Sequence, residues 1–207
     1  MHSKKIEDYK KNLKLSKQQK EILIGLMLGD GHLETQDNRT YRLKIEHSIK
    51  QKLYTDWLYR IWNKWVLTKP KTRIKELNGK QYLNYYFNTI SHGAFRFYAQ
   101  QFYQGKKKFV PRLIHRWLTP LAFAVWFMDD GSIKSKSHQA RILNTQGFDK
   151  KDVKRLAEVL QMKFDLKTSL RKQREGYQIM IAGGESAQKL YQLLDSHIRS
   201  SMRYKGY

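Results

Sequence analysis

The chain has 207 residues, of which 41 are Lys or Arg and 18 are Asp or Glu, so its formal net charge at pH 7 is +23. It contains no cysteine, which excludes disulfides and thiolate metal sites and favours a reducing compartment. Hydrophobic residues make up 40% of the chain, which supports a packed core rather than disorder. Because a charge of this size is best tolerated beside a polyanion, we expect nucleic acid as the partner.

The N-terminal segment and the apolar runs predict neither a secretory signal nor a membrane span. The first twenty residues mix lysines with acids and lack the apolar stretch of a secretory signal. The apolar runs elsewhere are shorter than the roughly 20 residues of a membrane span. We therefore expect a soluble protein without a membrane partner, in the cytoplasm of a bacterium or phage host or inside an organelle. Charge alone does not separate an enzyme from a ribosomal or RNA-packaging protein.

The first half of the chain begins with a helix. Ser16 and Gln19 form a capping box that predicts a helix running to about Gly29. Asn78 and Gly79 predict a type I′ turn between two strands. Hydrophobic periodicity gives the remaining elements. These are two strands, a helix, a hairpin and a helix, expected at 32–36, 41–47, 50–66, 72–89 and 92–103.

The second half follows a basic linker and opens with a clear helix start. Thr119 is placed to cap this helix and Pro120 to occupy its first position. We expect Gly31 and Gly131 to end the two helices in the left-handed conformation that glycine adopts freely. The order of the first half then recurs. Two strands, a helix, a hairpin turning at Glu175-Gly176 and a helix are expected at 132–136, 139–145, 149–164, 167–182 and 185–198.

Matching element order in the two halves predicts an α+β fold built from two αββαββα units related by pseudo-two-fold symmetry. Each unit contributes an antiparallel, saddle-like sheet, and a pair of helices forms the central interface. The expected domains are residues 1–105 and 119–207, joined by the linker at 106–118.

Two stretches, "ILIGLMLGDGH" (22–32) and "LAFAVWFMDDGS" (121–132), are apolar helices that end in an acid and a glycine. A helix that is apolar all round must be buried, and these two can bury each other. Gly25 and Gly29 allow the two backbones to approach closely, while Val125 and Asp129 are larger, so we expect an asymmetric seam. This packing would bring Asp30 and Asp130 together.

Two carboxylates at close range repel each other unless a hard divalent cation lies between them. Such a cation beside a basic surface is the arrangement that activates water against a phosphodiester. Asp130 rather than Asp129 is the expected partner of Asp30, because a glycine follows each of them directly.

The predicted strands alternate apolar and polar residues, which places one polar face opposite the core. A sheet whose exposed face carries Arg, Lys, Gln and Asn suits readout of the DNA major groove. The alternative is an ordinary solvated sheet face. The residues expected to contact DNA are Arg39, Arg42, Lys44, Glu46, Arg73, Lys75, Asn84, Tyr86, Lys134, Lys136, His138, Arg141, Lys167, Ser169, Arg171 and Gln178.

Two nine-residue segments, "LIGLMLGDG" (23–31) and "FAVWFMDDG" (123–131), resemble the motif of the LAGLIDADG homing endonucleases. The resemblance extends over about residues 15–205 and points to the monomeric, two-motif, intron-encoded type. It implies a single chain that binds double-stranded DNA and uses Mg²⁺. It also implies cleavage of both strands of a long asymmetric site to leave 3′ overhangs.

The resemblance also implies site residues. Asp30 and Asp130 match the metal-binding acids of the family, and the backbone carbonyls of Gly29 and Asp129 would assist them.

Other segments match the family's remaining catalytic groups. Lys108 in "KKFVP" and Lys205 in "MRYKG" would polarise the scissile phosphate or activate solvent. Gln146 in "NTQ" would position water, and Glu46 or His47 would be its counterpart in the first half. The alternative for each lysine is a solvated surface group.

Two other functions fit the same sequence. One is an intron RNA maturase, which would make intron RNA a partner, and the other is a DNA-binding regulator whose acids are inert. The presence of both acids favours cleavage.

Overall fold

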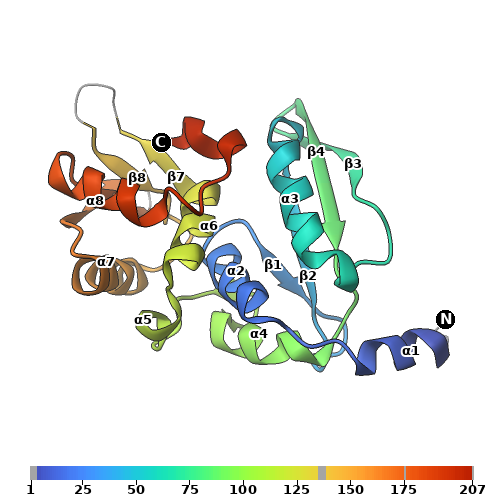
Figure 1. Ribbon diagram of the computed structural model, residues 1–207. Coiled ribbons are helices and arrows are strands. Elements are labelled where there is room, and N and C mark those ends of the chain that lie inside the picture. The colour runs from blue at the N-terminus through green and yellow to red at the C-terminus, as the bar shows by residue number, and fades with distance from the viewer. Residues whose placement is uncertain (1–3, 135–138, 175, 207) are drawn as a thin grey trace. The chain divides into compact units, whose positions relative to one another are not determined.

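The computed structural model describes residues 4–134, 139–174 and 176–206. It divides into two compact units. Unit 1 comprises residues 1–20 and 31–99, and unit 2 comprises residues 21–30 and 100–207. Each unit contains a four-stranded antiparallel sheet with helices packed against it (Figure 1). The two sheets have equivalent strand orders, β1-β2-β4-β3 and β7-β8-β10-β9, which confirms the α+β fold with a repeated αββαββα order.

Unit 1 is a sheet with one long helix across it. Its strands are β1 (His32–Glu34), β2 (Arg42–Ser48), β3 (Lys71–Leu77) and β4 (Lys80–Asn88). Its helices are α1 (Lys4–Lys11) and α3 (Lys52–Trp62), and α4 (Arg96–Phe102) begins at its end.

Alternation along β2 decides which face of this sheet is covered. Leu43 and Ile45 are buried under α3, where Tyr54, Leu58 and Trp62 form the buried stripe. The intervening residues of β2 point to the other face, as strand geometry requires. The sheet therefore has an apolar back and a polar front.

Unit 2 contains the second sheet and the helices around it. Its strands are β5 (Tyr103–Gln104), β6 (Lys107–Lys108), β7 (Gly131–Ile133), β8 (Arg141–Leu143), β9 (Thr168–Gln173) and β10 (Gly176–Ile181). Its helices are α5 (Ile114–Trp117), α6 (Pro120–Asp130), α7 (Lys150–Phe164), α8 (Glu185–Leu194) and a final 3-10 helix (Ser200–Lys205). Helix α2 (Lys17–Leu28) belongs to unit 2 from Glu21 onward.

The seam between α2 and α6 has the predicted asymmetry. A Cβ added to Gly25 would lie 2.4 Å from the carbonyl oxygen of Ala122 and 2.6 Å from Cβ of Val125. A Cβ added to Gly29 would lie 2.4 Å from Oδ2 of Asp129. The larger residue of α6 therefore fills the space left by each glycine, which confirms the central two-helix interface. Residues 22–28 and 122–129 are buried in consequence.

The prediction of left-handed glycines at the two helix ends is wrong. Gly131 has φ −72° and ψ 148°, and Gly31 is not among the residues with positive φ. Helix α6 passes directly into the extended strand β7, so no reversal of the chain is needed there. Gly131 is required by space instead, because a Cβ would lie 2.4 Å from the carbonyl oxygen of Phe127.

The β3–β4 turn confirms its prediction, since Asn78 (φ 52°) and Gly79 (φ 70°) both take the positive values of a type I′ turn. The segment at 106–118, expected as a basic linker, contains β6 and α5. Helix α1 was not expected from the sequence. The domain boundaries at 105 and 119 stay a prediction.

Among the described residues, no helix combines the length and the apolar composition that a membrane span needs.

Candidate active site

The seam of α2 and α6 ends in three acids. Asp130 is the last residue of α6, and Asp30 follows the end of α2 by two residues. The backbone N–H of Asp30 donates to Oδ2 of Asp129 at 3.0 Å. A carboxylate oxygen of Asp30 lies within 4.8 Å of one from Asp129. Asp129 is buried, so its carboxylate ties the two chain segments together at the foot of the seam.

The pKa of Asp130 is raised well above its usual range. Burial is the largest cause, and the charges of Asp30 and Asp129 add to it, while Lys108 and Lys205 act in the opposite direction. The cluster therefore disfavours its own full negative charge. A hard divalent cation with a preference for carboxylate and carbonyl oxygens would offset that repulsion, so the donor set fits such an ion.

One lysine reaches the end of each helix. Nζ of Lys108 donates to the carbonyl oxygen of Gly29 at 2.8 Å. Nζ of Lys205 donates to the carbonyl oxygen of Asp129 at 2.8 Å. Each lysine thus contacts the carbonyl group just before an acid, where the helix dipole also favours positive charge. A carbonyl oxygen has a second lone pair, so these contacts do not exclude the predicted carbonyl ligands.

Residues of α7 hold the segment that carries Lys108. Oδ2 of Asp152 accepts the backbone N–H of Val110 at 3.0 Å, and Nη1 of Arg155 donates to the carbonyl oxygen of Val110 at 2.8 Å. Arg155 also donates to Oδ1 of Asp152 at 2.8 Å. Asp152 is buried, so this clamp fixes the backbone two residues beyond the lysine. No local pattern in the sequence distinguishes Asp152 from an ordinary first-turn acid.

The C-terminal segment that carries Lys205 is held in a similar way. Nε of Arg141 donates to the carbonyl oxygen of Gly206 at 2.7 Å. Gly206 has φ +129°, and a Cβ there would lie 2.8 Å from Cγ1 of Ile133. Arg203 donates to Asp195 at 2.7 Å on the other side of the lysine. Arg141 therefore holds this segment, and its expected DNA contact stays a prediction.

Asn144 rather than Gln146 carries the hydrogen bonds to Asp130. Its Nδ2 donates to the carbonyl oxygen of Asp130 at 2.9 Å, and its backbone N–H donates to the same oxygen at 3.1 Å. Gln178 donates to Oδ1 of Asn144 at 2.7 Å. Strand β8 ends at Leu143, and Gln146 lies further on beside the β9–β10 hairpin. The catalytic role of Gln146 stays a prediction.

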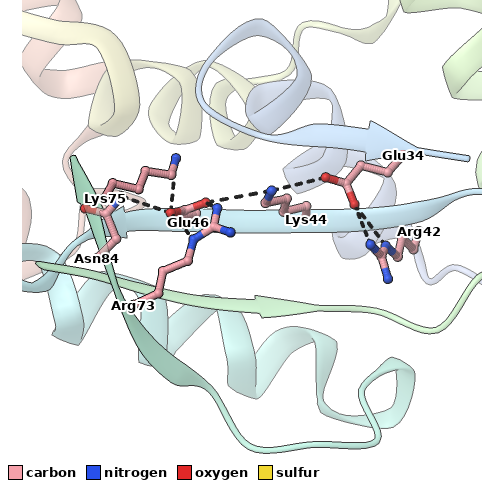
Figure 2. Close-up of polar contacts among 7 residues, drawn as sticks. All are labelled: Glu34, Arg42, Lys44, Glu46, Arg73, Lys75 and Asn84. Carbon is pink, nitrogen blue, oxygen red and sulfur yellow. Dashed lines mark hydrogen bonds and ion pairs between the residues drawn. The ribbon is translucent and has the colours of Figure 1, made fainter. Parts of the chain in front are cut away.

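Glu46 and His47 point to opposite faces of β2. His47 is buried beneath α3, with Nδ1 3.0 Å from Oγ1 of Thr55 and its ring 5.0 Å from that of Tyr54. Glu46 lies among cations on the polar front of the sheet (Figure 2). That Glu46 or His47 serves the first-half site stays a prediction.

The other residues expected to contact DNA are distributed over both units. On unit 1 the polar front carries a group from β2, β3 and β4, namely Arg42, Lys44, Glu46, Arg73, Lys75, Asn84 and Tyr86. Arg39 is exposed in the turn before β2. On unit 2 the exposed residues are Lys134, Lys167, Ser169 and Arg171, whereas Gln178 is buried. Lys136 and His138 lie outside the described residues.

The pKa of Lys108 gives a testable pH dependence. Burial lowers this pKa from 10.5 to about 8, although the charges of Asp130, Asp129 and Asp30 partly oppose the shift. Between about pH 8 and 10.5 the unfolded chain binds a proton that the folded protein lacks, so the free energy of unfolding should rise with pH. We expect urea unfolding in a metal chelator to show this rise for the wild type relative to Lys108→Met. Parallel pH curves for the two proteins would contradict it.

Two helices that lead into acids, each contacted at its end by a lysine from another segment, are the parts of an enzyme that acts on nucleic acid in this strongly basic chain. A sequence profile of the LAGLIDADG DNA endonuclease family matches residues 20–190. The chain belongs to this family.

Relatives cover nearly the whole chain. A probable intron-encoded endonuclease of Wickerhamomyces canadensis is 32% identical over 212 residues, covering 99% of this chain and 90% of the relative. The homing endonuclease I-WcaI, bound to its DNA recognition sequence, is 30% identical with a TM-score of 0.93, covering 100% of this chain and 93% of that structure. The cytochrome b mRNA maturase bI2 of Saccharomyces cerevisiae is 31% identical over 199 residues, covering 89% of this chain but 46% of the maturase.

Proposed function

We propose that the protein is a site-specific, metal-dependent DNA endonuclease that acts as a single chain. It hydrolyses phosphodiesters on both strands of a long asymmetric site and leaves 3′ overhangs. Membership of the LAGLIDADG DNA endonuclease family and the likeness to a DNA-bound homing endonuclease support this function. The observation that carries it for this chain is the paired arrangement of an acid and a lysine at the end of each seam helix.

Asp30 and Asp130 would hold the divalent ion, with the carbonyl groups of Gly29 and Asp129 beside them. Mg²⁺ is the proposed ion, and Mn²⁺ or Ca²⁺ would fit the same oxygen donors. When bound, the ion polarises the phosphodiester and lowers the pKa of its water. Because burial and then its acidic neighbours raise the pKa of Asp130, this carboxyl group would release its proton as the cation binds.

The two lysines would act on the phosphate and on solvent. Each has its ammonium group at the carbonyl that precedes an acid, where negative charge develops on the phosphate during attack. The pKa of Lys108 is about 8, so this lysine exchanges a proton near neutral pH. The neutral form of Lys108 would accept a proton from solvent, and Lys205 would polarise the scissile phosphate.

A cleavage assay tests the proposal directly. The protein should be incubated with Mg²⁺ and a plasmid that carries the uninterrupted form of the gene flanking its own reading frame. We expect linear DNA with 3′ overhangs at one site, and no product when the ion is chelated. A plasmid that stays intact over a range of ion concentrations would contradict the proposal.

Binding should also depend steeply on salt. With a net charge of +23 the chain can neutralise many phosphates, each of which releases counterions. For 6–10 phosphate contacts, we expect affinity for duplex DNA to fall by about 10³-fold or more between 50 and 200 mM salt. Fluorescence anisotropy in the presence of a chelator measures this without cleavage. A flat plot of log affinity against log salt concentration would exclude extensive contact with the DNA phosphates.

The likeness to a cytochrome b mRNA maturase favours a second candidate, assistance of intron splicing. A maturase would bind its intron RNA more tightly than duplex DNA and would not require Asp30 or Asp130. Splicing of the host intron in the presence of Asp130→Asn protein separates the two functions, because loss of the acid should leave maturase activity intact. A catalytically inert DNA-binding regulator would give binding without linear product.

A further inference from the structure

The polar front of the unit 1 sheet carries two carboxylates among its cations. Glu34 on β1 accepts from Arg42 through Nε at 3.0 Å and Nη2 at 2.8 Å, and from Lys44 at 3.1 Å. Lys44 also lies 3.9 Å from Glu46 on the same strand. Figure 2 shows that these contacts link the two acids into one network across β1, β2, β3 and β4. A surface that meets DNA gains nothing from acids by themselves.

Glu46 is the centre of this network. Its carboxylate accepts from Nε of Arg73 at 2.7 Å, from a second Arg73 nitrogen, and from Nδ2 of Asn84 at 2.9 Å. Lys75 lies 3.2 Å away. Burial raises the pKa of Glu46, but the hydrogen bonds from Arg73, Asn84 and Lys75 outweigh it and hold the pKa at about 2. Glu46 is therefore ionised at any pH where the protein works.

The network also contributes to stability, because the Glu46 side chain is only 9% exposed and its pKa is lowered to about 2. Four cations surround two carboxylates, so the face keeps a net positive charge that still attracts DNA. The carboxylates restrict the conformations that the cationic side chains can adopt.

Arg73 is held on two sides. Its Nε and Nη2 atoms point at Glu46, and its guanidinium carbon lies 5.0 Å from the centre of the Tyr86 ring. These contacts use one edge of the planar guanidinium, and the side chain is still 35% exposed, which leaves the edge formed by Nη1 and Nη2 for a ligand. That edge matches the O6 and N7 acceptors of guanine in the major groove.

We propose that Glu46 is a positioning residue that makes Arg73 a reader of one guanine in the target site. This inference rests on the proposed function, in which the polar front meets duplex DNA. An unrestrained arginine would contact phosphates at many sequences. Because Glu46 fixes the guanidinium plane in the free protein, the Arg73 side chain loses less conformational entropy when it binds DNA. Its negative charge also repels a phosphate placed at the same point, which favours a base edge there.

Base preference measured without cleavage tests the proposal. A pool of duplex DNA with randomised bases is selected for binding in a chelator and sequenced, for the wild type, Glu46→Gln and Arg73→Lys. We expect the wild type to prefer guanine at one position by about tenfold. Both variants should reduce this preference to about threefold or less while the other positions keep theirs. Glu46→Gln should add no further loss in the Arg73→Lys background, since both changes act through one contact.

Glu76→Gln is the matched control. Glu76 is exposed on the same strand as Arg73 but points to the opposite face, so this change removes an equal charge without touching the network. It should leave every base preference unchanged. Glu46→Gln should also steepen the salt dependence of binding, because a released Arg73 contacts phosphate. Thermal unfolding of each variant establishes that it is folded.

The outcomes separate this inference from the function on which it rests. A wild-type preference for guanine that Glu46→Gln leaves intact would overturn the inference alone. A uniform loss of affinity at all positions would assign Glu46 a structural role and would also overturn it. A wild-type protein with no base preference anywhere in the pool would overturn the proposed function as well.

Discussion

Asp30→Asn and Asp130→Asn should each lower the rate of DNA cleavage by about a thousandfold or more while DNA binding is retained. Charge stabilisation by a metal ion is worth several kcal/mol at the transition state, and each 1.36 kcal/mol is a factor of ten in rate. Binding should survive because these carboxylates oppose the phosphate when no ion is present. Cleavage rates in Mg²⁺ and affinities in a chelator measure the two effects separately.

Asp129→Asn is the control for this experiment. The amide oxygen of asparagine can still accept the backbone N–H of Asp30, and the carbonyl that contacts Lys205 is unchanged. We expect this variant to lose less than about tenfold in cleavage rate, because the side chain of Asp129 serves the seam rather than the reaction. Unimpaired cleavage by Asp30→Asn or Asp130→Asn would remove the two-acid mechanism.

The second large effect concerns the seam itself. Gly25→Ala should destabilise the protein by about 1–3 kcal/mol, because the added methyl group would overlap the backbone of α6. Its Cβ would lie 2.4 Å from the carbonyl oxygen of Ala122, which cannot move aside as a flexible side chain would. Urea unfolding of wild type and variant measures the difference, and cleavage should fall with it as Asp30 is displaced.

Gly147→Ala is the matched control for Gly25→Ala. A Cβ at Gly147 meets nothing within 4 Å, and its φ is not in the positive region. This variant should unfold within about 0.5 kcal/mol of the wild type, as surface substitutions usually do. Equal stability of Gly25→Ala and the wild type would mean that the two helices do not pack as closely as described.

The order of the elements could be predicted because its signals are local and strong. The all-round apolar character of 22–28 and 122–128 required burial, and Gly25 and Gly29 indicated a close neighbour. Helix α1 was missed because it has no buried residue to give it a pattern. The left-handed glycines were wrong because the sequence does not tell whether a helix reverses or continues into a strand.

Only those residues of the candidate site that lie within sequence motifs could be predicted. Asp30, Asp130, Lys108 and Lys205 lie in recognisable segments, and the structure brings them to one end of the seam. The residues that support them come from distant positions without a local pattern. Asp152 reads as an ordinary helix acid until its hydrogen bond to Val110 is known.

Strand register could not be predicted from the sequence either. Alternation placed Glu46 and Arg73 on polar faces, but their pairing depends on the central strand β4 between β2 and β3. The sequence therefore indicated two isolated candidates for DNA contact, whereas the structure joins them in one network.

A crystal structure of the protein on its DNA with Mn²⁺, located by anomalous scattering, tests the central claim most directly. We expect an ion ligated by one carboxylate oxygen from Asp30 and one from Asp130. An ion bound away from this pair, or acids too far apart to share one, would contradict it.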